Sequence, residues 1–147
     1  MKLAISSLVP APCERVFAAL VDPEILRRSI PGCESLSTAG PDAYEAVLKI
    51  GVAGLKGTYA GKAAIHDQRP PDSLTLTFEG KGGPGFLRGS AAIALSAEGE
   101  TTRIACDADV QVGGLIAAVG SRLVDAAAKK LAGDFFRQLS RELGGQA

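Results

Sequence analysis

The sequence is poor in the residues that carry most catalytic and metal chemistry. Its 147 residues include no tryptophan, one histidine, His66, and three cysteines, Cys13, Cys33 and Cys106. The cysteines are far apart, form no C-x-x-C pair and have a single histidine to join them, which argues against a zinc site or a disulfide framework. We therefore expect no bound metal, no cofactor and a protein of the reduced cytoplasm.

An excess of charge and a long apolar run are also lacking. Sixteen basic and sixteen acidic side chains give a formal net charge of zero, which leaves no electrostatic footprint for nucleic acid or for an anionic membrane. The N-terminal stretch MKLAISSLVPAP has no signal-peptide core. The most apolar stretch, VGGLIAAVG from Val112, is shorter than the roughly 20 residues that span a bilayer. The length predicts a single domain, residues 1–147, that does not cross a membrane.

One glycine-rich stretch has the spacing of a nucleotide-binding loop. GKGGPGFLRG, residues 80–89, places G-x-G-x-x-G at Gly80, Gly82 and Gly85. A dinucleotide loop needs a strand before it and a helix after it, because the phosphate binds N–H groups at the helix N-terminus. The residues after this loop alternate like a second strand, and Pro84 lacks an N–H. We therefore interpret the stretch as the loop of a hairpin.

The hydrophobic period changes along the chain. A strand over residues 2–9 precedes two short helices within residues 12–30, and five or six antiparallel strands then follow up to residue 112. Over residues 115–143 apolar side chains recur every three or four positions, which predicts one amphipathic helix about 40 Å long. This order predicts an α+β fold: a curved antiparallel sheet wrapped around a long C-terminal helix, with two short helices between the first two strands.

Polar residues on the strands are weak candidates for catalysis. His66 could act as a general base, and Asp107 with Asp109 could form an acid–base pair or bind a cation. Strand parity places all three on the solvent side, where charged residues normally lie. A cysteine could be a nucleophile, but none has a histidine near it in sequence, and Cys106 has the parity of the core.

Small residues face each other across the predicted interface between helix and sheet. Gly57, Gly61, Gly89 and Ala91 have the inward parity of three neighbouring strands, and the helix that covers them is rich in alanine and glycine. Because interiors pack densely, either the helix approaches the sheet closely or a space of roughly a few hundred cubic ångströms remains for a ligand. The sequence leaves both open. The side chains available to line such a space are apolar with one hydroxyl, that of Tyr59, so a ligand there would be lipophilic.

Four blocks of sequence, in order, resemble one family. IPGCESL, GLKGTYAGKA, GKGGPGFLRGSA and VQVGGLIAAVGSRLVDAAAKKLAGDFF are similar to the family of the G subunit of carbon monoxide dehydrogenase, in the START-like helix-grip superfamily. The resemblance extends from about Leu3 to Leu139. It implies a helix-grip fold and a non-catalytic accessory protein of a molybdenum hydroxylase. Such a protein would bind a lipophilic molecule, a quinone or a lipid, in an internal apolar cavity, and would help membrane association or electron-acceptor delivery.

The resemblance and the strand parity together predict the ligand contacts. The predicted contacts are inward-facing or lie at the rim of the cavity: Leu48, Ile50, Leu55, Tyr59, Gly61, Phe78, Phe86, Ile116, Val119 and Leu123. The implied partners are the ligand, subunits of the hydroxylase and the inner surface of the membrane, with no nucleic acid among them.

Two alternatives belong to other functional classes. One is an enzyme of the polyketide-cyclase or aromatase type, an activity of the same superfamily, which would need Tyr44, Tyr59 or His66 inside the cavity. The other is a ligand-free assembly module that contacts the hydroxylase through the hairpin at residues 80–89 and the apolar stretch 113–120, both of which we expect at the rim of the sheet.

Overall fold

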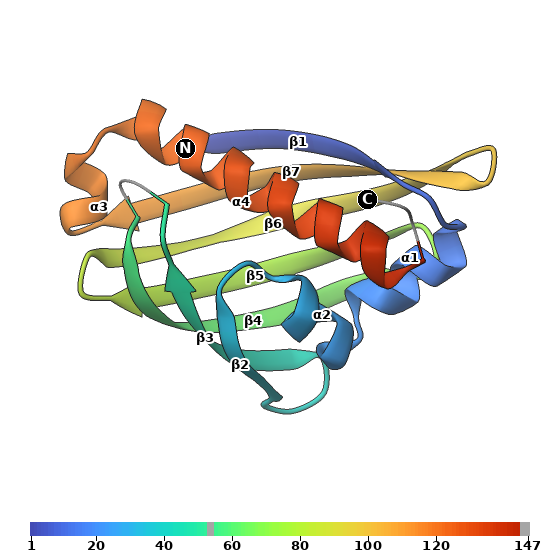
Figure 1. The fold of residues 1–147 in the computed structure, drawn as a ribbon, viewed down its shortest axis with the longest axis horizontal. Coiled ribbons are helices and arrows are strands. Elements are labelled where there is room, and N and C mark those ends of the chain that lie inside the picture. The colour runs from blue at the N-terminus through green and yellow to red at the C-terminus, as the bar shows by residue number, and fades with distance from the viewer. Residues whose placement is uncertain (53–54, 145–147) are drawn as a thin grey trace.

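The computed structural model describes residues 1–52 and 55–144 and shows one antiparallel sheet curled around a helix (Figure 1). Its strands lie in the order β1-β7-β6-β5-β4-β3-β2. The strand bounds are β1 (Lys2–Val9), β2 (Cys33–Thr38), β3 (Ala43–Ile50), β4 (Gly57–Arg69), β5 (Ser73–Gly82), β6 (Gly85–Glu98) and β7 (Thr101–Gly113). The helices are α1 (Cys13–Leu20), α2 (Pro23–Ser29), α3 (Leu115–Ala118) and α4 (Ser121–Glu142). The predicted fold class is confirmed.

The two short helices begin where the sequence predicts. α1 follows Pro12, and α2 has Pro23 in its first turn. The Asp22 carboxylate caps α2 by accepting hydrogen bonds from the backbone N–H groups of Glu24, at 2.9 Å, and Ile25, at 3.4 Å. Together the helices turn the chain back, so that α2 packs against both α4 and β2.

The predicted single C-terminal helix is wrong in one respect, because it is broken. Gly114 and Gly120, with φ of 73° and 94°, flank the short α3, and α4 begins at Ser121. An L residue with a side chain rarely adopts such φ values, so these glycines allow the chain to turn before α3 and again before α4. α4 is therefore about 33 Å long. No helix within the described ranges is long and apolar enough to cross a membrane.

The strand register assigns each side chain to a face. Tyr59 pairs with Leu48 and Gly82, and these positions share the face that is turned toward α4, which we call the inner face. His66 lies on the opposite, outer face and is exposed. The stretch 80–89 is the β5–β6 hairpin, in which Gly82 pairs with Gly85, so the hairpin interpretation of the G-x-G-x-x-G spacing is confirmed.

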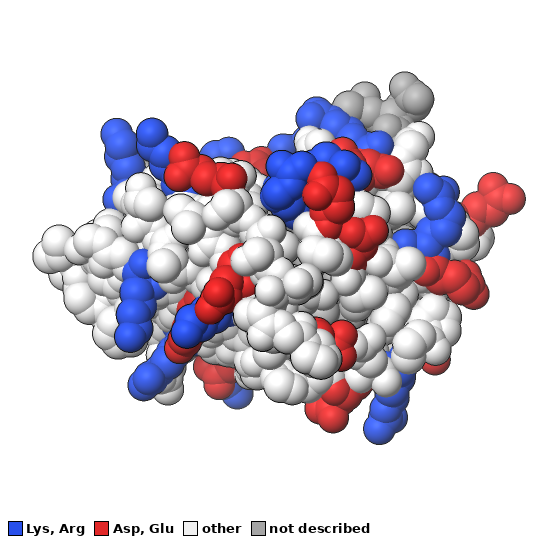
Figure 2. Space-filling model, turned by 90° about the horizontal axis from the view of Figure 1, so that it is seen from below, with Lys and Arg blue, Asp and Glu red and all other residues white. Residues whose placement is uncertain are grey.

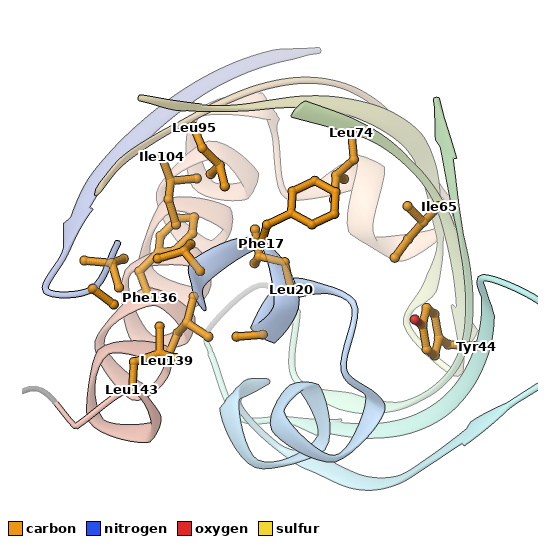
Figure 3. Close-up of a cluster of buried hydrophobic side chains, with 14 residues drawn as sticks. Phe17, Leu20, Tyr44, Ile65, Leu74, Leu95, Ile104, Phe136, Leu139 and Leu143 are labelled. Carbon is orange, nitrogen blue, oxygen red and sulfur yellow. The ribbon is translucent and has the colours of Figure 1, made fainter. Parts of the chain in front are cut away.

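The buried side chains form two separate clusters on the inner face. The larger lies between α1, the second half of α4 and the sheet, and its fully buried members include Val9, Val16, Ile104 and Leu139. In Figure 3 the side chains of α1 lie between the labelled residues of α4 and those of the central strands. The smaller cluster lies at the other end of the inner face, near α3. It consists of Ile50, Leu55, Tyr59, Ile116, Val124 and Ala127.

Candidate functional site

Between the two clusters, the central strands carry inward-facing residues that belong to neither cluster, and four of them are half-buried neighbours. They are Gly61 and Ala63 of β4, Phe78 of β5 and Leu87 of β6. Ala63 pairs with Phe78, and Gly61 pairs with Gly80, which in turn pairs with Leu87. The four are therefore neighbours on one face. We call them the inner strip.

The inner strip is only half-buried although it lies on the face that α4 covers. Leu131 and Phe135 on the facing helix are also half-buried. Protein interiors are close-packed, so neighbouring inward side chains that remain partly exposed mark a part of the concave face that the protein's own side chains do not cover. All four residues are apolar or lack a side chain, which suits an apolar molecule.

The inward glycines differ in the room they leave. A Cβ added to Gly61 would lie 3.5 Å from the carbonyl oxygen of Glu79 and 3.8 Å from that of Ala46, which are ordinary contacts. A Cβ at Gly57 would lie 2.7 Å from Pro84, and one at Gly89 would collide with the backbone of β7. Of the three glycines that the sequence places inward, Gly61 alone leaves space, whereas the other two allow close backbone approach.

The two tyrosine hydroxyls on the inner face are already used as donors. Tyr59 donates to the carbonyl oxygen of Leu55 at 2.6 Å, and Tyr44 donates to that of Val21 at 2.9 Å. Burial raises the pKa of both phenols, and the nearby carboxylates of Asp42 and Asp22 raise that of Tyr44 further. Both phenols therefore stay neutral and hold backbone in place, which makes them poor acids or bases for catalysis.

The other candidate catalytic groups lie away from the inner strip. His66 is exposed on the outer face with its Nε2 3.0 Å from the Thr77 hydroxyl, and Asp107 and Asp109 are exposed on β7. Cys106 is on the inner face, but burial, and to a lesser degree Asp107, raises the pKa of its thiol. This keeps the thiol protonated and unreactive. Within the described ranges, no three His, Cys, Asp or Glu side chains are grouped in a way that could hold a metal ion.

The ten predicted ligand contacts fall into three places. Leu48, Ile50, Leu55, Tyr59 and Ile116 pack together in or against the smaller cluster. Gly61 and Phe78 lie on the inner strip. The remaining three, Phe86, Val119 and Leu123, are exposed, by 38%, 39% and 42%. Their role in ligand binding stays a prediction.

Two apolar residues of interest are absent from the predicted set. Leu87 has the inward parity of β6, and that alternation was the signal that could have placed it on the inner strip. Leu115 is 71% exposed, the largest value among the large apolar side chains. The helical periodicity gave no sign of this exposure, because it treats Leu115 as the start of a continuous helix.

The β5–β6 hairpin and α3 are in direct contact at one end of the sheet. The N–H of Ile116 donates to the carbonyl oxygen of Pro84 at 2.9 Å, and the ring of Phe86 covers Gly113. An open hollow of about 520 Å³ lies beside them, lined by Arg88, Gln111 and Ser121 among others. A second open hollow, of about 470 Å³, lies on the outer face over β2 to β5. The β5–β6 hairpin and the stretch 113–120 thus both lie at the rim of the sheet, as the sequence predicts.

The family model for the G subunit of carbon monoxide dehydrogenase (CoxG) matches residues 6–144. This match covers nearly all of the chain, including the inner strip, both clusters and α3. The chain belongs to the CoxG family. The resemblance of the four sequence blocks is therefore confirmed over the whole helix-grip region.

Solved structures support the same fold. A conserved protein from Geobacillus kaustophilus is 36% identical with a TM-score of 0.94, over 98% of this chain and 95% of that one. A START superfamily protein from Mycobacterium smegmatis has a TM-score of 0.76 at 14% identity, over 97% of each chain. A protein from Rhizobium leguminosarum has a TM-score of 0.72 at 21% identity, over 96% of this chain and 95% of that one. A search of curated proteins found no match. This member of the CoxG family thus has a START-like fold.

Proposed function

We propose that this CoxG-family chain is a non-catalytic accessory protein of a molybdenum hydroxylase of the carbon monoxide dehydrogenase type. It binds a lipophilic small molecule, a quinone or a lipid, against the inner strip. It works on the cytoplasmic side, peripheral to the membrane, and helps membrane association or delivery of the electron acceptor.

The half-buried inner strip is the observation that carries this proposal. An apolar surface left uncovered between two well-packed clusters gains free energy when a ligand removes it from water, by about 25 cal/mol per Å². The strip offers Phe78 and Leu87 as contacts and Gly61 as open space. The neutral, hydrogen-bonded tyrosines support binding rather than chemistry.

The experiment is a titration with a water-soluble quinone analogue, followed by ligand fluorescence and by native mass spectrometry of the purified protein. Wild type should bind the analogue. Gly61→Leu should weaken binding at least about tenfold because the new side chain fills the space above the strip. The fold should persist, since an added Cβ at Gly61 meets only ordinary contacts.

Ala60→Leu is the matched control. Ala60 is the preceding residue of β4 and is exposed on the outer face, so the same leucine side chain is introduced on the other side of the sheet. Its affinity should equal that of wild type. Equal affinity for Gly61→Leu and wild type would show that the strip is not the binding surface. Wild-type protein that never binds the analogue or a lipid would refute the ligand-binding function.

The same variants test the link to the hydroxylase. Affinity purification of the chain from its own cells should retain the hydroxylase subunits with wild type and with Ala60→Leu. If the hydroxylase is retained while no ligand binds to any variant, the chain is the ligand-free assembly module instead. The enzyme alternative has less support, because His66 lies on the outer face and lines neither hollow.

A further inference from the structure

The segment that carries α3 protrudes at one end of the molecule (Figure 1), and apolar side chains at this end are exposed. Ile116 is fully buried and fixes α3 to the smaller cluster. Leu115 and Val119 are four positions apart, which places them on the same side of one helical turn, and both are exposed. Leu123, in the first turn of α4, is exposed as well. We call these three residues the α3 tip.

Four segments around the α3 tip carry basic residues and no acidic ones, and the Asp109 carboxylate of β7, near the same end, lies 3.8 Å from the Met1 ammonium group. Residues 49–52, 55–58, 81–87 and 111–123 contain Lys49, Lys56, Lys81 and Arg122 and no aspartate or glutamate. The cluster of Ile50, Leu55 and Ile116 joins the first, second and fourth segments, and the bond from Ile116 to Pro84 joins the third. The net charge of zero therefore conceals a cationic end.

The distribution of charged side chains over the surface agrees with a cationic α3 end. In Figure 2 the left end of the molecule, where α3 lies in Figure 1, is white, and the coloured side chains nearest to it are blue. The hollow beside α3 has Arg88 as its charged lining side chain and no carboxylate. The ion pairs Arg28–Glu142 and Arg103–Glu98 involve residues outside these four segments.

We propose that the α3 tip docks on a lipid bilayer that carries anionic headgroups. Leu115, Val119 and Leu123 enter the boundary between headgroups and acyl chains, and Lys49, Lys56, Lys81 and Arg122 lie near the phosphates. The inference rests on the proposed function, since a carrier of a lipophilic molecule must meet the membrane that contains it. The proposed function does not say which surface contacts the membrane, and this inference identifies that surface as the α3 tip.

The shape and size of the tip favour a bilayer over a protein partner. A stable protein interface buries more than about 1,000 Å² in complementary shapes, whereas the tip is a small protrusion built around a four-residue helix. A fluid bilayer needs no matching hollow. It binds through a few inserted apolar side chains together with cations attracted to anionic lipid.

The test is co-sedimentation with vesicles in the absence of quinone. One set is phosphatidylcholine alone, and the other contains phosphatidylcholine with phosphatidylglycerol. Wild type should bind the anionic vesicles more tightly, and added salt should weaken this binding because it screens the charges. Leu115→Asp should lower the partition coefficient at least about tenfold, since it loses the burial of a leucine. Lys56→Gln and Arg122→Gln should each lower it about fivefold.

Exposed residues elsewhere supply the matched controls. Leu8 of β1 is 47% exposed, so Leu8→Asp makes the same chemical change away from the tip. Lys62→Gln removes a cation from the outer face of β4. Both controls should bind anionic vesicles like wild type.

Several results would overturn the proposal. These are wild type that binds neither vesicle, Leu115→Asp that binds as wild type does, and Leu8→Asp that loses as much binding as Leu115→Asp. If Leu115→Asp binds vesicles normally but loses the co-purifying hydroxylase, the tip is a protein-docking surface. Leu115 is not among the predicted ligand contacts, so Leu115→Asp should bind the soluble quinone analogue as wild type does, and a failure of membrane docking leaves the proposed ligand binding intact.

Discussion

The two ends of the inner face are built in opposite ways. At the α1 end, the larger cluster encloses Val16, Ile104 and Leu139 completely, and α1, α2 and α4 cover the sheet. At the α3 end, Ile116 is enclosed but its neighbour Leu115 is 71% exposed. The first end has the features of a stabilising core. The second has surface that its own chain leaves unpartnered, which is where binding is expected.

This difference between the two ends shows why one sheet can both stabilise the fold and provide a surface for binding. Among the described residues, the larger cluster contains 14 buried residues and the smaller one six, so the α3 end can keep glycine turns, exposed leucine and a half-buried strip without unfolding the protein. Variants that affect only stability should therefore map to the α1 end, and variants that affect only binding should map to the inner strip and the α3 tip.

The largest effect is expected for Leu139→Ala. Leu139 is fully buried in the larger cluster, so its truncation leaves a cavity and should lower the free energy of unfolding by about 2–5 kcal/mol. Leu123→Ala removes the same atoms from an exposed position of the same helix and should change it by less than about 0.5 kcal/mol. Urea unfolding of both variants measures the difference. Equal losses would show that the two ends of α4 contribute alike.

A smaller effect is expected at Thr102, a fully buried polar residue of the α1 end. Its hydroxyl donates to the carbonyl oxygen of Ala11 at 2.7 Å, within the turn that leads from β1 into α1. Thr102→Val leaves that carbonyl without its partner and should lower the free energy of unfolding by about 1–3 kcal/mol.

Thr101→Val is the control for this substitution. The Thr101 hydroxyl donates to the carbonyl oxygen of Glu98 at 2.6 Å, but this bond is exposed, so water can replace it. The control should lose little stability in the same urea titration. A loss as large as that of Thr102→Val would mean that burial does not decide the strength of these bonds.

Much of the fold could be read from the sequence because strand alternation records which face is buried. The alternation placed Tyr44 and Tyr59 inward and His66 outward, as the structure has them. The break before α4 was harder to predict, because apolar spacing continues across Gly120 and a glycine inside a helical pattern is usually tolerated. The positive φ of Gly120 depends on how the chain must turn to lie across the sheet.

The candidate site was less predictable because it depends on contacts between distant segments. Composition gave a net charge of zero, and only the fold brings Lys49, Lys81 and Arg122 to one end. Parity likewise could not tell which inward glycine leaves space. Gly61 and Gly89 have the same parity, but the backbone of β7 approaches Gly89 closely.

The smallest effect concerns the ion pair between Arg103 and Glu98, where the β6–β7 hairpin turns at the end of the sheet opposite α3. The hydrogen bond that Arg103 Nε donates to Glu98, 2.5 Å long, lowers the pKa of the Glu98 carboxyl, and the charge of the guanidinium lowers it further. A carboxyl with a lowered pKa in the folded state stabilises the fold above its unfolded pKa. This contribution disappears as pH falls through the folded pKa. Because the pair is exposed, its effect on stability should be slight and should shrink with salt.

An NMR titration of the Glu98 side chain measures the interaction. Arg103→Gln should raise the titration midpoint of Glu98, which reports the pKa of its carboxyl, toward the ordinary range. An unchanged midpoint would show that Arg103 does not stabilise the Glu98 carboxylate in the folded protein.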